Sequence, residues 1–283
     1  MIFFCNNLVI IEWYYLILDK IIPIPRAVYT MFTKRRNIVD EEGWTHVIDR
    51  AQRAPKIQNK NAANSLSRTG DYEVDGVPYI KRNLDEVQRE YIYWQKQWDE
   101  SSACTELRNK LVSIIEKNTK CEIRNIVVLG IGSLLSARRE ARRCSATQLA
   151  AVRTMLQVLN DSASVIVQDP QYVKMDNEFL SHLGWTTVEN PKAFEMIGLN
   201  SLVFAVHCYQ NLYCTIARGC KPAILVGTKF ERFEMLEYGS QNLSSNLSLL
   251  KCMYKEYSDE MDFPQMRHDF SDTKIYWRIA AMQ

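Results

Sequence analysis

Short apolar runs that alternate with helical stretches occupy the chain from Cys121 onward, and this alternation limits the fold more than any other feature. Five runs have the character of buried strands: Ile126–Leu129, Ser164–Val167, Trp185–Val188, Leu202–Val206 and Ala223–Val226. Three amphipathic stretches between them predict helices: Ala146–Leu159, Asp176–Leu183 and Leu212–Ala217. Such alternation indicates βαβ units, and continuous apolar strands are typical of a sheet covered on both faces. We therefore predict an α/β fold, in which a mostly parallel sheet is flanked by helices.

The first 30 residues differ from the rest. Their apolar run, Leu8–Leu18, is shorter than the roughly 20 residues that a membrane span needs, and it lacks the flanks of a signal peptide. Three interpretations stay open: a strand or short helix that packs on the domain, an interfacial anchor, or an extension before a natural start at Met31. We expect an apolar extension at residues 1–30 that is not necessarily native.

The predicted helical elements of the amino-terminal part lie within residues 31–120. A polar stretch at 51–78 predicts a linker or long loop. Apolar residues at steps of three and four then predict helices at Leu84–Trp98 and Thr105–Lys117. Residues 121–283 would form the α/β core with its carboxyl-terminal tail.

Composition excludes several classes of protein. The chain is 47% hydrophobic and 24% charged, which argues against disorder and against a polytopic membrane protein. A formal net charge of +2 gives no general attraction to nucleic acid, and we expect no specific nucleic-acid partner. The eight cysteines form no Cys-x-x-Cys pair and the four histidines are scattered, so we predict no metal site. Free thiols favour a reducing compartment, the cytoplasm or the nucleus.

Two of the scarce glycines, Gly130 and Gly132, follow the first predicted strand and precede Ser133. In an open parallel sheet, ligands bind beyond the carboxyl ends of the strands. Glycine lets a backbone approach a phosphate closely, and a following helix offers free N–H groups. The third glycine of the dinucleotide fingerprint is missing, because residues 134–144 are inserted before the helix that Ser145 would cap. The turn therefore either binds a ligand or is only a tight strand-to-helix connection.

Other candidate site residues follow the remaining strands. Asp169 stands where a doubly wound fold places an acid for ribose hydroxyls, although an Asp-Pro turn explains it equally. His207 is a candidate acid or base that could activate the thiol of Cys208. Because adjacent residues on a strand point to opposite faces, this pair could also be purely structural. Gly227 and Thr228 complete the predicted ligand rim.

Several segments in this order resemble the Sensitivity to Red Light Reduced (SRR-like) domain. Five of them lie in the predicted core: NIVVLGIGS, ATQLAAV, VIVQDPQYVKMDNEFLSHLG, LVFAVHCYQNLY and AILVG. Outlying segments at 43–47 and 270–275 resemble its Gly-Trp-Thr-x-Val and Phe-Asn-Asp-Thr-Ser-Ile elements. The chain departs from the family pattern where Val206 and Tyr209 replace prolines around His-Cys, and where Thr228 and Lys229 replace Asn-Ser.

The resemblance implies a Rossmann-like fold and a regulatory role in the cytoplasm or nucleus. Family members are linked to circadian-clock control, to the regulation of haem synthesis and to microtubule-related phenotypes, and no reaction is established for them. Three hypotheses follow. The first is a regulatory protein that binds a small anionic or nucleotide-like ligand at the strand ends, together with a protein partner. The second is a methyltransferase-like or tetrapyrrole-related enzyme that uses His207, and the third is a scaffold without a ligand. No cofactor is assigned.

Overall fold

The computed structural model describes residues 35–39, 45–49, 70–117, 122–237 and 244–278. Strands β1 (Arg35–Val39) and β2 (Thr45–Asp49) pair antiparallel in a unit of their own, separate from the unit that holds the larger sheet. The predictions for residues 1–30 and for most of the polar stretch at 51–78 lie outside the described residues.

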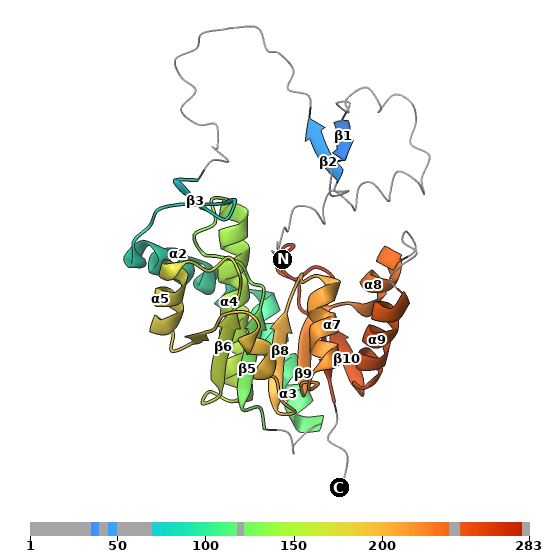
Figure 1. Ribbon diagram of the computed structural model, residues 1–283. Helices are drawn as coiled ribbons and strands as arrows, with labels where there is room; N and C mark the ends of the chain where they lie inside the picture. Colours follow the sequence, from blue (N-terminus) through green and yellow to red (C-terminus); the bar gives the residue numbers. More distant parts are fainter. Residues whose placement is uncertain (1–34, 40–44, 50–69, 118–121, 238–243, 279–283) are drawn as a thin grey trace, which may run out of the picture. The chain divides into compact units, whose positions relative to one another are not determined.

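The larger unit is built on a seven-stranded sheet with the order β10-β11-β9-β8-β5-β6-β7 (Figure 1). Its strands are β5 (Asn125–Leu129), β6 (Ser164–Gln168), β7 (Thr186–Thr187), β8 (Ser201–Ala205), β9 (Ile224–Thr228), β10 (Asp259–Asp262) and β11 (Thr273–Trp277). Strands β5 to β9 pair parallel, and β11 is antiparallel to both of its neighbours. The predicted mostly parallel sheet is therefore confirmed. Chain order reverses between β5 and β8, which makes their carboxyl ends the topological switch point.

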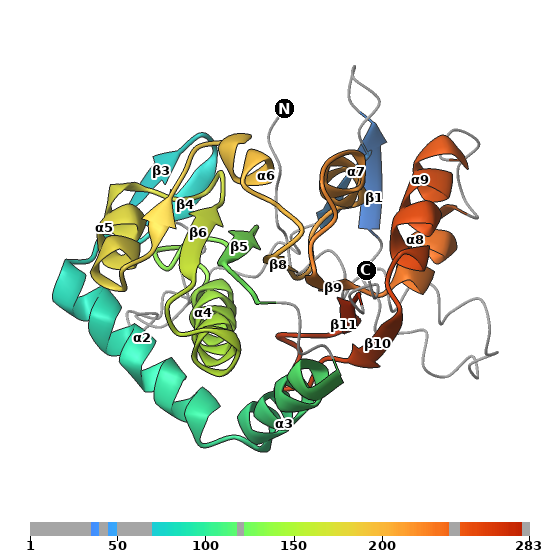
Figure 2. The ribbon, with the colours of Figure 1, turned by 90° about the horizontal axis from the view of Figure 1, so that it is seen from below.

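Helices cover both faces of this sheet. One face packs against α4 (Arg139–Leu159) and α5 (Lys174–His182), and α2 (Leu84–Asp99) and α3 (Ser102–Lys117) form an outer layer on α4 (Figure 2). The other face carries α6 (Lys192–Glu195), α7 (Gln210–Arg218), α8 (Phe230–Glu237) and α9 (Ser244–Lys255). Within the described part of the chain, no helix is long and apolar enough to cross a bilayer.

The side chains of β5 show why its apolar run is continuous. Ile126 and Val128 are buried against the α4 side, whereas Val127 and Leu129 are buried against the α7 side. A strand with period-two side chains and two covered faces needs apolar residues at every position. The prediction of buried strands is confirmed for β5, β6, β8 and β9. It is wrong for Trp185–Val188, because β7 is a two-residue strand at the edge of the sheet, and its Thr186 is exposed.

The amino-terminal helices lie where their periodicity predicted them, and Asn83 begins α2 with a capping box to Glu86. The start of α4 was predicted wrongly. The helix begins at Arg139, so Ser145 lies within it, and its single hydroxyl proton is shared between the Ala141 and Ile131 carbonyl oxygens, each 2.9 Å from Oγ. The first turns of α4 contain arginines that are buried in ion pairs. Because these residues are charged, the sequence predicted an insertion there and no buried helix.

The end of the polar stretch is also more ordered than predicted. Strands β3 (Tyr72–Val74) and β4 (Val77–Tyr79) form a hairpin, with Asp75 and Gly76 both at positive φ in the turn. The hydroxyl of Tyr79 donates to the Gln171 carbonyl oxygen at 3.0 Å. Three-residue strands are too short for a reliable alternation pattern, so only the turn residues signalled this hairpin.

Candidate functional site

The turn after β5 requires glycine at two positions. Gly130 has φ +71° and Gly132 has φ +85°, both in the left-handed region that other residues avoid. A Cβ on Gly130 would stand 2.7 Å from the Sγ of Cys208. A Cβ on Gly132 would stand 3.3 Å from the Oγ of Ser145. The backbone at Gly130 therefore passes closer to Cys208 than a Cβ allows, whereas a Cβ on Gly132 would make only a tight contact.

Two buried carboxylates from the segment after β6 hold this turn. Asp169 accepts hydrogen bonds from the backbone N–H of Gly132 at 2.6 Å and from that of Gln171 at 2.7 Å. Asp176 accepts from the Ser133 hydroxyl at 2.7 Å and from the Leu134 backbone N–H at 2.9 Å. The three successive residues 132–134 are therefore all fixed by carboxylate acceptors.

Burial dominates the electrostatics of these acids. It raises the pKa of Asp169 to about 6, although the two backbone donors favour the charged form. It raises the pKa of Asp176 to about 6 as well, again against its hydrogen bonds. Near neutral pH both groups are mostly ionised and act as acceptors.

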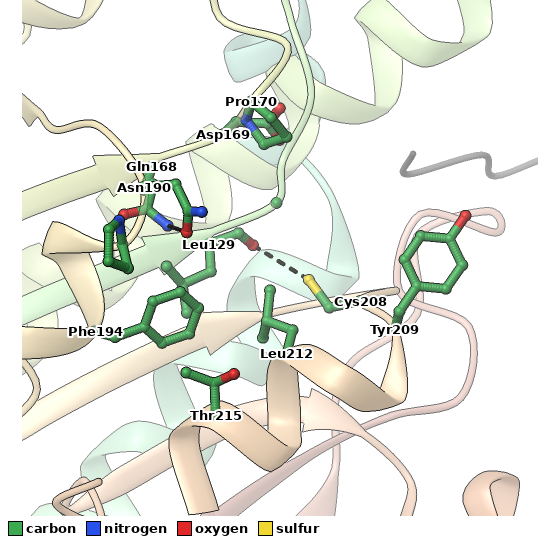
Figure 3. Close-up of a pocket in the computed structure, with 12 residues that line it drawn as sticks. Leu129, Gln168, Asp169, Pro170, Asn190, Phe194, Cys208, Tyr209, Leu212 and Thr215 are labelled. Atoms are coloured by element: carbon green, nitrogen blue, oxygen red, sulfur yellow. Dashed lines mark hydrogen bonds between the residues drawn. The ribbon is translucent and has the colours of Figure 1, made fainter. Parts of the chain in front are cut away.

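A cavity of about 260 Å³ opens beside the turn, at the carboxyl ends of β5, β6 and β8 (Figure 3). Its lining consists of Leu129, Gly130, Gln168, Asp169, Pro170, Asn190, Pro191, Phe194, Cys208, Tyr209, Leu212 and Thr215. The cavity thus lies at the topological switch point, where open α/β sheets bind ligands. Within this lining Asp169 is the only Asp, Glu, Lys or Arg.

The structure brings three of the predicted site residues to the cavity, namely Gly130, Asp169 and Cys208. Gly132 and Ser133 are not among the lining residues. The Ser133 hydroxyl donates to Asp176 and accepts from the Leu135 backbone N–H at 2.9 Å. The geometry therefore gives Ser133 a role in shaping the turn.

His207 and Cys208 diverge. Cys208 lines the cavity, and its Sγ lies 3.5 Å from the Leu129 carbonyl oxygen. His207, at φ +57°, is not a lining residue, and its Nε2 is 3.0 Å from the Ser271 carbonyl oxygen. Burial lowers the pKa of His207 and favours the neutral ring. The ring therefore contacts the segment before β11, away from the cavity lining.

The end of β9 is filled by an aromatic ring. A Cβ on Gly227 would stand 2.8 Å from the ring of Tyr213, which α7 places there. The Tyr213 hydroxyl accepts from the Thr228 backbone N–H at 2.7 Å and donates to the Ala205 carbonyl oxygen. Gly227 and Thr228 thus pack against Tyr213 and do not line the cavity.

Sequence reasoning missed most of the cavity wall. Asn190 comes shortly after the two-residue strand β7, and Phe194 lies in the four-residue helix α6. Both elements are too short to show a periodic pattern in the sequence. Leu212 and Thr215 lie one turn apart on the predicted α7 helix and would have been found by asking which helix face meets the strand ends.

Comparison with known proteins gives a family match that spans most of the chain. The family model described as the SRR1 domain matches residues 94–277. None of the curated proteins matches.

Solved structures give only a distant likeness. The chain is similar to cofactor-bound Rv0187 from MTB, at 10% identity and TM-score 0.39, over 68% of this chain and 89% of that one. It is also similar to a Corynebacterium glutamicum protein, at 10% identity and TM-score 0.37, over 71% and 100% of the two chains. A fibrillarin pre-rRNA processing protein from Methanococcus jannaschii has 10% identity and TM-score 0.32, over 56% and 68%. Likeness at this level says nothing of function.

Proposed function

The chain belongs to the SRR1 domain family, and on that premise we propose that it is a regulatory protein that binds the nucleoside part of a small nucleotide-like ligand. The observation that carries the proposal is the cavity at the carboxyl ends of β5, β6 and β8. Gly130, Asp169 and Cys208 reach it from three different strand ends, as a ligand site at a switch point requires.

The chemistry of the wall favours a flat, mostly uncharged group. Leu129, Phe194, Leu212 and two prolines supply apolar surface for a ring. Each Asp169 carboxylate oxygen accepts one hydrogen bond from a backbone N–H, and each can accept a second one from a ligand hydroxyl. An acceptor at the end of the second core strand suits ribose hydroxyls.

The phosphate part of the earlier hypothesis finds less support. Because α4 begins six residues before Ser145, its first turn lies roughly 9 Å along the helix axis from the residue that faces Gly132. The N–H of Gly132 is also occupied by Asp169. Together with the lack of Lys or Arg in the cavity lining, this favours a nucleoside over a free anion.

The regulatory role rests on the family. In an SRR-like protein of cytoplasm or nucleus, ligand binding would change the interaction with a protein partner that acts in circadian or haem-synthesis regulation. The enzyme alternative is less favoured, because His207 does not line the cavity and hydrogen-bonds to the backbone at Ser271. A scaffold without a ligand is the remaining alternative.

A thermal-shift panel tests the proposal on the full chain. The compounds are adenosine, nucleotides, S-adenosylmethionine, nicotinamide cofactors and haem. A compound at 100 times its dissociation constant stabilises the folded state by about 2.7 kcal/mol. We expect a nucleoside-containing compound to stabilise the wild type and to lose its effect on Thr215→Trp, because Thr215 is an exposed residue of the cavity wall.

Asn211→Trp is the matched control. Asn211 is equally exposed on α7, four residues before Thr215, and it does not line the cavity. This variant should respond like the wild type. If no compound stabilises the wild type, or if both tryptophan variants respond fully, the proposed site is refuted and the scaffold is favoured.

A further inference from the structure

The orientation of one amide group in the cavity wall is dictated by the backbone. The Oε1 atom of Gln168 accepts a hydrogen bond from the Ala193 backbone N–H at 3.0 Å. A backbone N–H is only a donor, so the atom facing it must be the amide oxygen. The amide nitrogen of Gln168 therefore has to point the other way.

That nitrogen in turn fixes Asn190. The Gln168 Nε2 donates to the Asn190 Oδ1 at 3.2 Å, at one side of the cavity, across from Cys208 and Tyr209 (Figure 3). Because Gln168 is buried and its amide cannot be reversed without losing the Ala193 bond, Asn190 must turn its oxygen toward Gln168. Among the described residues, none accepts a hydrogen bond from the Asn190 Nδ2.

We propose that Asn190 is the specificity-determining residue of the cavity and that its Nδ2 donates to a ring nitrogen of a purine nucleoside. This inference rests on the proposed function and adds the class of ligand to it. The relay from Ala193 through Gln168 to Asn190 leaves a fixed donor on the wall, so the ligand has to present an acceptor there.

The rest of the wall supports this class. Asp169, the residue after Gln168, presents an acceptor that suits the hydroxyls of a sugar. Phe194 and Leu129 lie below both polar groups in the view of Figure 3 and offer apolar faces to a ring. A donor for the base, an acceptor for the sugar and apolar surface beside them are complementary to a nucleoside.

The test is a calorimetric titration of the full chain with adenosine and its 1-deaza, 3-deaza and 7-deaza analogues. Each analogue replaces one ring nitrogen acceptor with C–H. For the wild type we expect one of the three to bind about fivefold to tenfold more weakly than adenosine, as loss of one neutral hydrogen bond implies. The other two should bind much like adenosine.

Asn190→Asp is the diagnostic variant. It keeps the shape and the oxygen that accepts from Gln168, and it replaces the donor with an acceptor at an exposed position. Adenosine should bind about tenfold more weakly, and the penalty of the sensitive analogue should vanish. A merely structural role for Asn190 would leave that penalty unchanged.

Gln168→Glu is a second variant, which should reverse the orientation of the Asn190 amide. The Ala193 N–H would hold one carboxylate oxygen, and the other would require Asn190 to turn its NH₂ group inward and its oxygen toward the ligand. The penalty should vanish here too, with Asn190 itself unchanged, once circular dichroism confirms folding.

The outcomes separate this inference from the proposed function. If adenosine binds and Thr215→Trp blocks it, but all three deaza analogues bind equally, the Asn190 assignment is overturned and the cavity remains a ligand site. If no purine-containing compound binds, while a pyrimidine nucleotide binds and is blocked by Thr215→Trp, the purine class is overturned. If nothing binds, both proposals fail.

Discussion

Gly130 and Gly227 lie near the carboxyl ends of β5 and β9, the two strands that flank β8, yet their surroundings differ. Gly130 at φ +71° lets the chain turn beside Cys208, and the space beyond it is an open cavity. Gly227 makes room for the ring of Tyr213, which fills the corresponding space beside β9. A glycine at a strand end therefore indicates a close approach, and only the third dimension shows whether a ligand or a side chain makes it.

The same contrast applies to the polar groups. Asp169 and Asp176 hold the turn on the open side through backbone N–H and hydroxyl donors. On the filled side the Tyr213 hydroxyl replaces a ligand, because it accepts from Thr228 and donates to Ala205. The sheet edge at Asp169 therefore borders a cavity, whereas the end of β9 is filled by the side chain of Tyr213.

The largest expected effect comes from Gly227→Ala. The new Cβ would stand 2.8 Å from the buried Tyr213 ring, which cannot withdraw without losing its hydrogen bonds. We expect a loss of about 3 kcal/mol in the free energy of unfolding, measured by urea denaturation. Unchanged stability would show that the β9 side is not closely filled.

The acids of the open side predict the next effect, a dependence of stability on pH. A pKa of about 6 for Asp176 exceeds the unfolded value of about 3.9, so the folded state binds more protons between these values. Stability therefore falls as pH rises through this window, by roughly 2 kcal/mol between about pH 4.5 and 6.5.

The variant Asp176→Asn should lose this share of the slope in urea denaturation at several pH values. His207 contributes with the opposite sign, because its lowered pKa makes the fold less stable as pH falls. His207→Gln is therefore the control, and it should leave the contribution of Asp176 in place. An identical slope in Asp176→Asn and the wild type would contradict the burial account.

The smallest expected loss of stability is that of Gly130→Ala, about 1.5 kcal/mol from the strained φ. The Cys208 thiol can move away from the new Cβ because it borders a cavity. Displaced into that cavity, the thiol should weaken ligand binding, whereas Gly227→Ala should leave the affinity of the folded protein unchanged. Calorimetric titration of both variants with adenosine checks this prediction. Equal affinities in the two variants would contradict the difference between the open cavity at Gly130 and the filled space at Gly227.

Much of the fold was readable from the sequence, because doubly covered strands must be apolar at every position and amphipathic helices repeat every three to four residues. The start of α4 was missed because Arg142 and Arg143 are buried through pairing with Glu90 and Asp269, contacts with distant parts of the chain. Local sequence patterns do not indicate ion-pair partners that are distant in the chain.

The candidate site was only half predictable, for the same reason. Residues at strand ends were found because topology fixes where those ends meet, and Asp169 is an example. The wall residue Asn190 was not, because its orientation depends on Gln168 and on a single backbone N–H. The burial of His207 likewise depends on the segment before β11, more than 60 residues later in the chain.

The most direct test of the central claim is a crystal structure of the full chain with adenosine at saturating concentration. The account predicts the nucleoside in the cavity, with its sugar at Asp169 and its base at Asn190. Adenosine bound at another surface, or a cavity that stays empty while calorimetry reports binding, would contradict it.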